Sequence, residues 1–345
     1  MSARTTAASA RSDATPHEVA RLLADPARRF VLTCHRNADG DALGSLLGLA
    51  RAMRAAGQDV TLSHPDPDPV PEDLAFMRRT DEEIGASLPP DVGEMTLVTL
   101  DCASEGRLWE TPEHERAGLL INVDHHQDNT RFGHRNLIEP HASSSAEVVV
   151  HILDAAGWPL TVDVAEPLYI GLITDTGRFC YANTGAEAHR IAARMVEAGL
   201  DPSAIARTLY EEQPPERVAL MGRALTRAEL RSDGRLIVSA LTAEDFSAAG
   251  GDDTEGIVEV MRQVRGVEVA GLVREAGPDG AHRVSLRSSD GTVDVSAIAR
   301  LEGGGGHKAA AGFSTAMRPD ELLDWITDHV TRRLDAPNDR AARGG

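Results

Sequence analysis

The chain has 345 residues, of which 41% are hydrophobic and only 3% aromatic, so we expect two domains of roughly 100–200 residues each with aliphatic cores. The formal net charge is −19. Proteins that bind long duplex nucleic acid neutralise many phosphates with basic patches, so this charge argues against such a partner and favours a small anionic substrate held by metal ions or a few arginines.

The first predicted element is a short helix behind an irregular tail. Residues 1–14 are rich in Ala, Ser and Thr, and we expect them to be disordered. Thr15 and Pro16 have the pattern of an N-cap followed by proline at the first helical position, which predicts a helix that continues through Leu23.

Apolar runs then alternate with helical patterns through the N-terminal half. Buried strands are predicted at residues 30–32, 60–62, 97–100 and 119–123. Helices are predicted from Leu43 to Met53, over 144–155 and over an apolar segment that begins at Pro167. This alternation predicts an α/β domain with a mostly parallel sheet flanked by helices.

The C-terminal part predicts a second, smaller α/β domain behind a helical linker. We expect a tail at 1–14, the first domain at 15–200, the linker at 201–233, the second domain at 234–335 and a tail at 336–345. In the second domain, strands are predicted at 236–241, 267–273 and 283–287, and helices at 254–264, 295–301 and 319–334.

Cysteine usage and hydropathy bear on the cellular compartment. Cys34, Cys102 and Cys180 are too few and too scattered for a disulfide framework or a zinc site, which is typical of a reducing cytoplasm. The N-terminus lacks the apolar core of a leader peptide, and no apolar run approaches the roughly 20 residues that span a bilayer. We therefore expect a cytoplasmic protein without a membrane partner, in which Cys34 and Cys102 serve packing.

Residues of the types that commonly bind metal ions follow several of the apolar segments. The first strand is followed by His35, Asp39 and Asp41 in a predicted loop, and later segments end at Asp101, at Asp124-His125-His126 and at Asp175. Parallel sheets gather the carboxyl ends of their strands along one edge, where ligands bind. We therefore expect these side chains to converge, although each one alone could also be a turn, capping or surface residue.

Two histidines and four carboxylates suit a pair of divalent metal ions. Manganese is a more natural occupant than zinc because no thiolate takes part. Two ions together lower the pKa of a bridging water and clamp the attacking and leaving oxygens of a phosphoryl transfer. The cluster therefore predicts a phosphoesterase or a pyrophosphatase. Ser143-Ser144-Ser145 have the pattern of a helix cap rather than of a nucleophile elbow.

The motifs resemble those of one family. Asp124-His125-His126 resembles the signature that names the DHH phosphoesterase superfamily, and N-A-D-G-D-A-L-G-S at 37–45 is similar to its first motif. G-G-G-G-H-K-A-A-A-G at 303–312 resembles the glycine-rich motif of the associated DHHA1 domain, as do residues 253–259 and 284–289. The resemblance covers residues 15–335 and is closest to the two-domain group of oligoribonucleases and 3′-phosphoadenosine-5′-phosphate (pAp) phosphatases, some of which cleave cyclic dinucleotides.

This resemblance implies roles for the clustered residues. His35 and Asp39 would hold one metal ion, and Asp41, His125 and Asp175 the other, with Asp101 bridging the two. His126 would face the scissile phosphate, and Asp124 would orient the histidines from behind. Asn37 would either organise its loop or reach a substrate oxygen. Ala38 stands where the family commonly has proline. This departure changes none of the expected metal ligands.

The resemblance also implies that the second domain binds the substrate. Backbone amides of the glycine run can approach a phosphate closely, and the expected binding residues there are Gly304, Gly305, Gly306 and His307. Arg287, with Ser285 and Ser288 beside it, is the candidate for a terminal phosphate or base, although by charge alone Arg262 or Arg265 could serve.

The expected activity is manganese-dependent hydrolysis, by hydroxide attack with two metal ions, of short 5′-phosphorylated oligoribonucleotides to mononucleotides and of pAp to AMP. A phosphodiesterase for cyclic di-AMP or linear pApA remains open, because it needs the same metals and an adenine-tolerant pocket. A RecJ-like exonuclease, a type II pyrophosphatase and a non-catalytic nucleotide sensor fit less well. A homodimer is implied by the resemblance alone.

Overall fold

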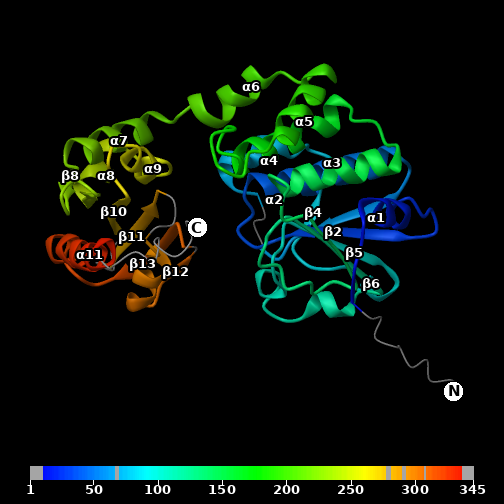
Figure 1. The fold of residues 1–345 in the computed structure, drawn as a ribbon, viewed down its shortest axis with the longest axis horizontal. Helices are drawn as coiled ribbons and strands as arrows, with labels where there is room; N and C mark the ends of the chain where they lie inside the picture. Colours follow the sequence, from blue (N-terminus) through cyan, green and yellow to red (C-terminus); the bar gives the residue numbers. More distant parts are fainter. Residues whose placement is uncertain (1–10, 67–69, 277–280, 290–292, 307, 336–345) are drawn as a thin grey trace, which may run out of the picture. The chain divides into compact units, whose positions relative to one another are not determined.

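The computed structural model describes residues 11–66, 70–276, 281–289, 293–306 and 308–335, and the predicted tails lie largely outside them. The chain forms two compact units, residues 1–211 and residues 212–345 (Figure 1). The finer domain and linker boundaries stay predictions. Among the described residues, no helix combines the length and apolarity that crossing a bilayer requires.

The first unit is built on a seven-stranded sheet in the order β1-β7-β6-β5-β2-β3-β4, and every neighbouring pair is parallel. The strands are β1 Ser12–Asp13, β2 Arg29–Cys34, β3 Asp59–Ser63, β4 Ile84–Gly85, β5 Thr96–Leu100, β6 Leu119–Asp124 and β7 Arg135–Ile138. The predicted α/β class and parallel sheet are confirmed. The sequence missed β1, β4 and β7, which are short strands that carry few apolar residues.

The helices of this unit lie mainly on one side of the sheet (Figure 1). They are α1 Pro16–Leu23, α2 Gly40–Ala55, α3 Ser145–Ala156, α4 Val162–Asp175, α5 Ala186–Glu197 and α6 Pro202–Ala206, followed by a π-helical turn at Arg207–Glu211. Phe30 and Leu32 of β2 face this helical layer. Val31 faces the opposite core, which is covered by loops and the 3-10 turns η2 Val92–Glu94, η3 Glu105–Arg107 and η4 Glu113–Arg116.

The predicted helix signals around α1 and α3 are confirmed. Thr15 caps α1, and its hydroxyl and the Glu18 carboxylate form a capping box. The Ser144 hydroxyl accepts a hydrogen bond from the Glu147 amide at the start of α3, and Gly157 ends that helix with φ at 66°. The Glu147 carboxylate accepts from the Ser143 amide instead of closing the box on Ser144.

The prediction that Pro167 begins a helix is wrong, because α4 starts at Val162 and contains Pro167 in its interior. Proline has no amide hydrogen, so the carbonyl four residues earlier, that of Asp163, loses its helical donor. The guanidinium of Arg51 donates to that oxygen at 3.1 Å. Arg51 also pairs in the interior with Glu82, at 2.7 Å. A distant side chain thus satisfies the carbonyl that Pro167 leaves open.

Helices α2 and α4 pack backbone against backbone. Gly40, Gly44 and Gly48 recur every four residues on the face of α2 that meets α4. A Cβ atom at Gly44 would lie 2.3 Å from the Pro167 carbonyl oxygen, and one at Gly48 would lie 2.5 Å from the Leu168 side chain. This close approach brings the first turn of α2 beside the C-terminal end of α4.

The second unit is a smaller sheet with helices on both faces. Its order is β12-β13-β11-β10-β9-β8, with β9 and β10 parallel and the other pairs antiparallel. The strands are β8 Glu229–Arg231, β9 Leu236–Leu241, β10 Val269–Ala276, β11 Ala281–Ser288, β12 Gly305–Gly306 and β13 Ala310–Thr315. Helices α7 Pro215–Thr226, α8 Ala243–Ala249 and α9 Ile257–Arg262 lie over one face, and α10 Val295–Ala299 and α11 Pro319–Leu334 over the other.

Most predicted elements of this unit are present with shifted ends. The helix predicted at 254–264 is shortened to α9, because Gly256 takes a left-handed conformation with φ at 76° immediately before it. The helix predicted at 295–301 continues beyond α10 as a 3-10 turn, Arg300–Glu302. The prediction for residues 319–334 matches α11.

Candidate metal centre and anion-binding face

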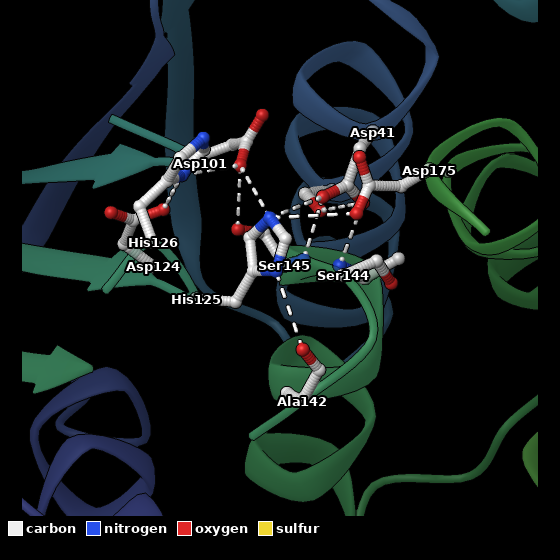
Figure 2. A network of polar contacts seen from close by, with 12 residues as sticks. Asp41, Asp101, Asp124, His125, His126, Ala142, Ser144, Ser145 and Asp175 are labelled. Carbon is white, nitrogen blue, oxygen red and sulfur yellow. Dashed lines mark hydrogen bonds and ion pairs between the residues drawn. The ribbon is translucent and has the colours of Figure 1, made fainter. Parts of the chain in front are cut away.

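The clustered acids and histidines converge at the carboxyl edge of the parallel sheet (Figure 2). His35 follows β2, Asp101 follows β5, Asp124 is the last residue of β6, and Asp175 is the last residue of α4. The prediction that Asp39 and Asp41 lie in a loop is wrong for Asp41. Asp39 is the N-cap of α2, and Asp41 lies in the first helical turn.

Asp101 lies between two sets of side chains. Its Oδ2 atom is 3.3 Å from Nε2 of His35, and its Oδ1 atom is 3.7 Å from Nε2 of His125. Its backbone is in the left-handed region, with φ at 55°, which is uncommon for a residue other than glycine and costs free energy. The two carboxylate oxygens therefore face different sets.

The first set is His35, Asp39 and Asp101, and the second is Asp41, His125 and Asp175; in each, the potential ligand atoms lie within 4.8 Å of one another. His35 Nε2 is 3.8 Å from Asp39 Oδ2. His125 Nε2 is 3.6 Å from Asp175 Oδ2 and 3.9 Å from Asp41 Oδ2. A third group, Asp101, His125 and His126, overlaps both.

The two histidines are oriented by backbone carbonyls. His35 Nδ1 lies 2.8 Å from the Arg36 carbonyl oxygen, and His125 Nδ1 lies 3.3 Å from that of Ala142. A proton on each Nδ1 satisfies these contacts and leaves Nε2 as the ring atom that could bind a metal ion. Nε2 of His35 is buried without a well-formed hydrogen bond.

A neutral histidine behind the site fixes His35 in place. His64 is fully buried, and its Nδ1 accepts a hydrogen bond from the Asp66 amide at 3.0 Å. Its Nε2 therefore carries the proton and donates to the His35 carbonyl oxygen at 3.0 Å. Burial lowers the pKa of His64, so it stays neutral. This role of His64 was not predicted from the sequence.

The Asp41 carboxylate lies at the N-terminus of α3. It accepts hydrogen bonds from the Ser145 amide at 2.6 Å and the Ala146 amide at 2.9 Å, which helix ends provide for anions. The Ser145 hydroxyl donates to Asp101 Oδ1 at 2.9 Å. Ser145 thus holds two of the carboxylates, although the sequence indicated only a helix cap.

The carboxylates are crowded enough to change their acidity. Burial and the neighbouring Asp101 and Asp175 carboxylates raise the pKa of Asp41 well above its usual value. Burial and repulsion from Asp101 and Asp39 raise the pKa of Asp175 to about 6. Desolvation by the surrounding protein opposes ionisation of Asp39 too, although its side chain is exposed, but His35 outweighs this effect and lowers the pKa of Asp39 to about 2. Burial alone would lower the pKa of His35, whereas Asp101 and Asp39 raise it to about 9.

This donor set fits divalent cations. The oxygen and imidazole atoms are those that manganese, magnesium and similar ions accept, and no thiolate is among them. Cys34 and Cys102 are buried in the two cores, and burial raises the pKa of the Cys102 thiol to about 12. A cation would relieve the repulsion among the carboxylates and use the buried His35 Nε2.

His126 is held by a separate acid. The Asp124 carboxylate, which is fully buried, accepts from His126 Nδ1 at 2.8 Å and from Asn129 Nδ2 at 2.5 Å. The hydrogen bond to Asp124 raises the pKa of His126 to about 9, against the effect of burial. Asp124 thus orients His126 but not His125, and the sequence missed Asn129.

Asn37 contributes through its backbone. It has φ at 54°, which asparagine tolerates better than most residues, and its amide donates to Asp66 Oδ2 at 2.6 Å. This contact organises the loop, while its predicted contact with substrate stays a prediction.

The predicted binding residues of the second unit that the structure describes lie on β11 and on or beside β12, with β13 between these two strands. Ser285 and Arg287 point to one face of β11, because side chains alternate along a strand, whereas Ser288 points to the other face and is buried. Gly305 and Gly306 form β12, which pairs with β13. A Cβ atom at Gly304 would lie 2.3 Å from the Gly312 carbonyl oxygen, so close strand packing requires that glycine. His307 lies outside the described residues.

Arg274 of β10 shares this face and was missed by the sequence analysis. It donates to the Thr254 hydroxyl at 2.7 Å and the Ser285 hydroxyl at 3.2 Å, while its Nε atom is buried without a hydrogen bond. Burial and then repulsion from Arg283 and Arg287 lower the pKa of Arg274. Arg287 pairs with Glu259 at 2.6 Å. This face, defined by Arg274, Arg283, Ser285 and Arg287, suits an anion.

Comparison with protein families gives two matches. The model of the DHH family, N-terminal domain, matches residues 29–172, and the model of the DHHA1 domain matches residues 233–334. Together they account for both units.

Curated relatives extend over nearly the whole chain. The bifunctional oligoribonuclease and PAP phosphatase NrnA of Thermus thermophilus is 35% identical over 319 residues, 92% of this chain and 93% of the relative. NrnA of Bacillus subtilis is 26% identical, over 83% of this chain and 88% of its own. A solved exopolyphosphatase-related protein from Bacteroides fragilis superimposes with a TM-score of 0.82 at 23% identity, covering 92% of this chain and 96% of that one, which shows the shared fold.

Proposed function

Because the chain belongs to the DHH family and joins its N-terminal domain to a DHHA1 domain, we propose that this phosphoester hydrolase cleaves short 5′-phosphorylated oligoribonucleotides to mononucleotides and pAp to AMP. Its similarity to two proteins named as oligoribonuclease and PAP phosphatase, over most of each chain, supports this choice of substrates.

The observation that carries the proposal is the position of Asp101 between two ligand sets. Its Oδ2 atom faces His35 and its Oδ1 atom faces His125, as a carboxylate shared by two ions requires. His35 and Asp39 would hold one ion, and Asp41, His125 and Asp175 the other. When bound, such a pair, manganese for preference, lowers the pKa of water and neutralises charge on a phosphate.

The remaining residues of the site would act on the substrate and on its orientation. His126, whose pKa is raised to about 9 by its hydrogen bond to Asp124, would carry a proton at neutral pH and donate a hydrogen bond to a phosphate oxygen. Its other nitrogen is fixed by Asp124 at 2.8 Å, so the ring cannot rotate away. Charge-assisted hydrogen bonds of this kind are roughly twice as strong as neutral ones.

The second unit would bind a phosphate group other than the one that is cleaved. Among the described residues, the Arg274 guanidinium donates to two hydroxyl groups and keeps a buried Nε without a hydrogen bond, while Asp252 attracts it more weakly than burial and the neighbouring arginines oppose its charge. A buried charge that is incompletely compensated is costly. An anionic ligand would remove that cost. A requirement for such an end group, together with the net charge of −19, favours short substrates over long polymers.

The test is product analysis with purified protein and Mn²⁺ on pApA, pAp, cyclic di-AMP and a 24-residue RNA in parallel. We expect AMP from pApA and pAp, slow loss of the long RNA and full inhibition by a chelator. Faster turnover of cyclic di-AMP would move the main substrate to cyclic dinucleotides, and rapid loss of the long RNA would contradict the proposal.

A variant pair tests the shared carboxylate. Asp101→Asn should keep the fold, judged by circular dichroism, and lose activity by about a hundredfold or more, on the scale of other preorganised charges. Asp59→Asn makes the same change at an exposed position, the first residue of β3, at the edge of the sheet opposite the metal-binding side chains. This control should leave activity unchanged. Near-normal turnover by Asp101→Asn would exclude a metal-bridging role.

A further inference from the structure

An aromatic cluster lies around the C-terminal end of α4, the helix that ends at Asp175. The chain contains only three tyrosines, and all of them, Tyr169, Tyr181 and Tyr210, belong to this cluster. The rings of Tyr169 and Phe179 have centroids 6.4 Å apart. The ring of Tyr181 lies against Gly177, where an added Cβ atom would be 2.4 Å from it. In a chain with 3% aromatic residues, this concentration beside the metal centre needs a reason.

The backbone of this segment is strained. Gly177, Arg178 and Phe179 are consecutive and all left-handed, with φ at 54°, 62° and 62°. Only glycine adopts this conformation without cost, and such strain persists where the surroundings enforce it, often at ligand sites. The turn is enforced by hydrogen bonds from the Arg178 amide to the Ile173 carbonyl, at 2.7 Å, and from the Tyr181 amide to the Thr176 carbonyl, at 2.9 Å.

The neighbours of Tyr181 are anchored, whereas Tyr181 is open to solvent. Phe179 stacks on His189 with a centroid distance of 5.0 Å and an interplanar angle of 28°. The Arg178 guanidinium lies 4.5 Å from the centroid of Tyr210, which belongs to the π-helical turn at Arg207–Glu211. Tyr181 is 52% exposed. The strained turn therefore packs the partly buried Phe179 and the exposed Arg178 against neighbouring rings, and it leaves the ring of Tyr181 exposed.

Tyr181 is also close to the cluster of acids. Gly177, against which its ring packs, is two residues from Asp175, so their Cα atoms are at most about 7.6 Å apart. Asn183 folds the segment back, because its amide donates to the Asp175 carbonyl at 3.1 Å and to its Oδ2 at 3.3 Å. The same amide donates to the Ser143 carbonyl at 2.9 Å, which ties the segment to the residues before α3.

We propose that Tyr181 stacks on a nucleobase of the substrate and that the strained turn at Gly177–Phe179 exists to present its ring. This inference rests on the proposed nucleotide substrate and names a contact for its base. One side of the ring is supported by the Gly177 backbone, so its exposed side is a rigid surface. Stacking is available to every base because each has a π face, which suits an enzyme that degrades short RNA of any sequence.

The test separates base recognition from phosphate chemistry. Kinetics are measured on pAp and on the same bisphosphate without adenine, 1-deoxyribose 3,5-bisphosphate, for the wild type, Tyr181→Phe and Tyr181→Leu. We expect Tyr181→Leu to raise KM for pAp about tenfold, within the range of single-base stacking, with kcat little changed. Tyr181→Phe should keep the wild-type KM, and neither variant should change kinetics on the base-free compound.

A control and a binding measurement complete the test. Phe76→Leu removes another exposed aromatic ring, which is 39% exposed in the turn η1 Glu72–Met77, and should leave both substrates unaffected. Calorimetric titration with AMP should show the same tenfold loss for Tyr181→Leu without turnover. The stacking role would be overturned if Tyr181→Leu raised KM equally for both bisphosphates, or if it left KM for pAp unchanged. Failure of the wild type on both compounds would instead contradict the proposed function.

Discussion

Ser145 shows how one side chain can organise a charged centre without binding a metal. Its amide donates to Asp41 at 2.6 Å and its hydroxyl donates to Asp101 at 2.9 Å. These two acids come from α2 and from the end of β5, so Ser145 fixes the separation between groups that the chain places 60 residues apart. Residues of this kind set the orientation of metal ligands and are required for tight binding.

We expect Ser145→Ala to weaken metal binding by about tenfold to a hundredfold with little change in stability. The neighbouring Ser144→Ala removes the N-cap of α3 and should lower the free energy of unfolding by about 1 kcal/mol, while the metal affinity stays near that of the wild type. Metal titration and chemical denaturation of both variants check this. Weaker metal binding in Ser144→Ala, or a loss of stability with normal metal binding in Ser145→Ala, would contradict the roles given to the two serines.

The raised pKa of Asp175 predicts a pH-dependent cost in the metal-free protein. Its pKa is about 6 in the folded chain, against roughly 3.9 when unfolded. The folded state therefore binds this proton more tightly, so stability falls as pH rises from about 4 to about 6 and stays reduced above that range. We expect Asp175→Asn to stabilise the chelator-treated protein by about 1 kcal/mol at pH 7.5.

The same substitution should have little effect on stability near pH 3, where the carboxyl is mostly protonated in both states. Thermal unfolding of both proteins at the two pH values, with chelator present, measures the difference. Asp175→Asn should also reduce the stabilisation that added Mn²⁺ gives to the wild type, because it removes a ligand from one of the two sets. A variant that is less stable at pH 7.5 would contradict the repulsion among these acids.

At the scale of elements, the contact between α2 and α4 decides whether Asp41 and Asp175 can face one ion. Gly171 of α4 leaves no room for a Cβ atom, which would lie 2.9 Å from Asp41 Oδ1. Gly44 of α2 leaves none either, since a Cβ atom there would meet the Pro167 carbonyl at 2.3 Å. The two helices can therefore hold their acids at this separation only with glycine at the contact.

We expect Gly44→Ala to force α2 and α4 apart, with a loss of about 1–3 kcal/mol in stability and weaker metal binding. Gly222→Ala is the matched control, because that glycine lies inside α7 with no atom within 4 Å of an added Cβ. Alanine there should stabilise the protein by up to about 1 kcal/mol. Calorimetric unfolding and metal titration distinguish the outcomes. An unchanged metal affinity in Gly44→Ala would contradict the dependence of the site on this helix contact.

Elements with strong local signals were predictable from the sequence, and elements that depend on distant partners were not. Thr15, Ser144 and Gly157 act within one helical turn, so their spacing alone identified the ends of α1 and α3. Pro167 was misassigned because its position inside α4 depends on Arg51, more than a hundred residues earlier. Local rules cannot include such a donor.

The same distinction applies to the candidate site. His35 and Asp101 follow strands that the parallel sheet brings together, and Asp175 ends the apolar segment that forms α4. Ser145 and Arg274 became apparent only in three dimensions, because their partners come from other strands and helices. Ser288 was grouped with Arg287 by sequence, although neighbouring residues of a strand point to opposite faces.

For the whole molecule, charge and substrate size are linked. A net charge of −19 repels long RNA, so attraction has to come from a few localised groups such as those on the face that carries Arg274. We expect Arg274→Gln to raise KM about tenfold for pApA, as the loss of charge-assisted hydrogen bonds to a phosphate would. For ApA, which lacks the 5′-phosphate, KM should hardly change. Steady-state kinetics on the two dinucleotides measure this difference.

Arg332→Gln makes the same change in net charge at an exposed position on α11, so it separates local contact from the overall field. If Arg274 binds the terminal phosphate, only Arg274→Gln loses the preference for pApA over ApA. If long-range attraction sets the preference, both variants lose it slightly and salt reduces it to the same extent in both. Equal KM changes for pApA and ApA in Arg274→Gln would mean that this arginine supports the fold of the second unit and does not recognise the end of the substrate.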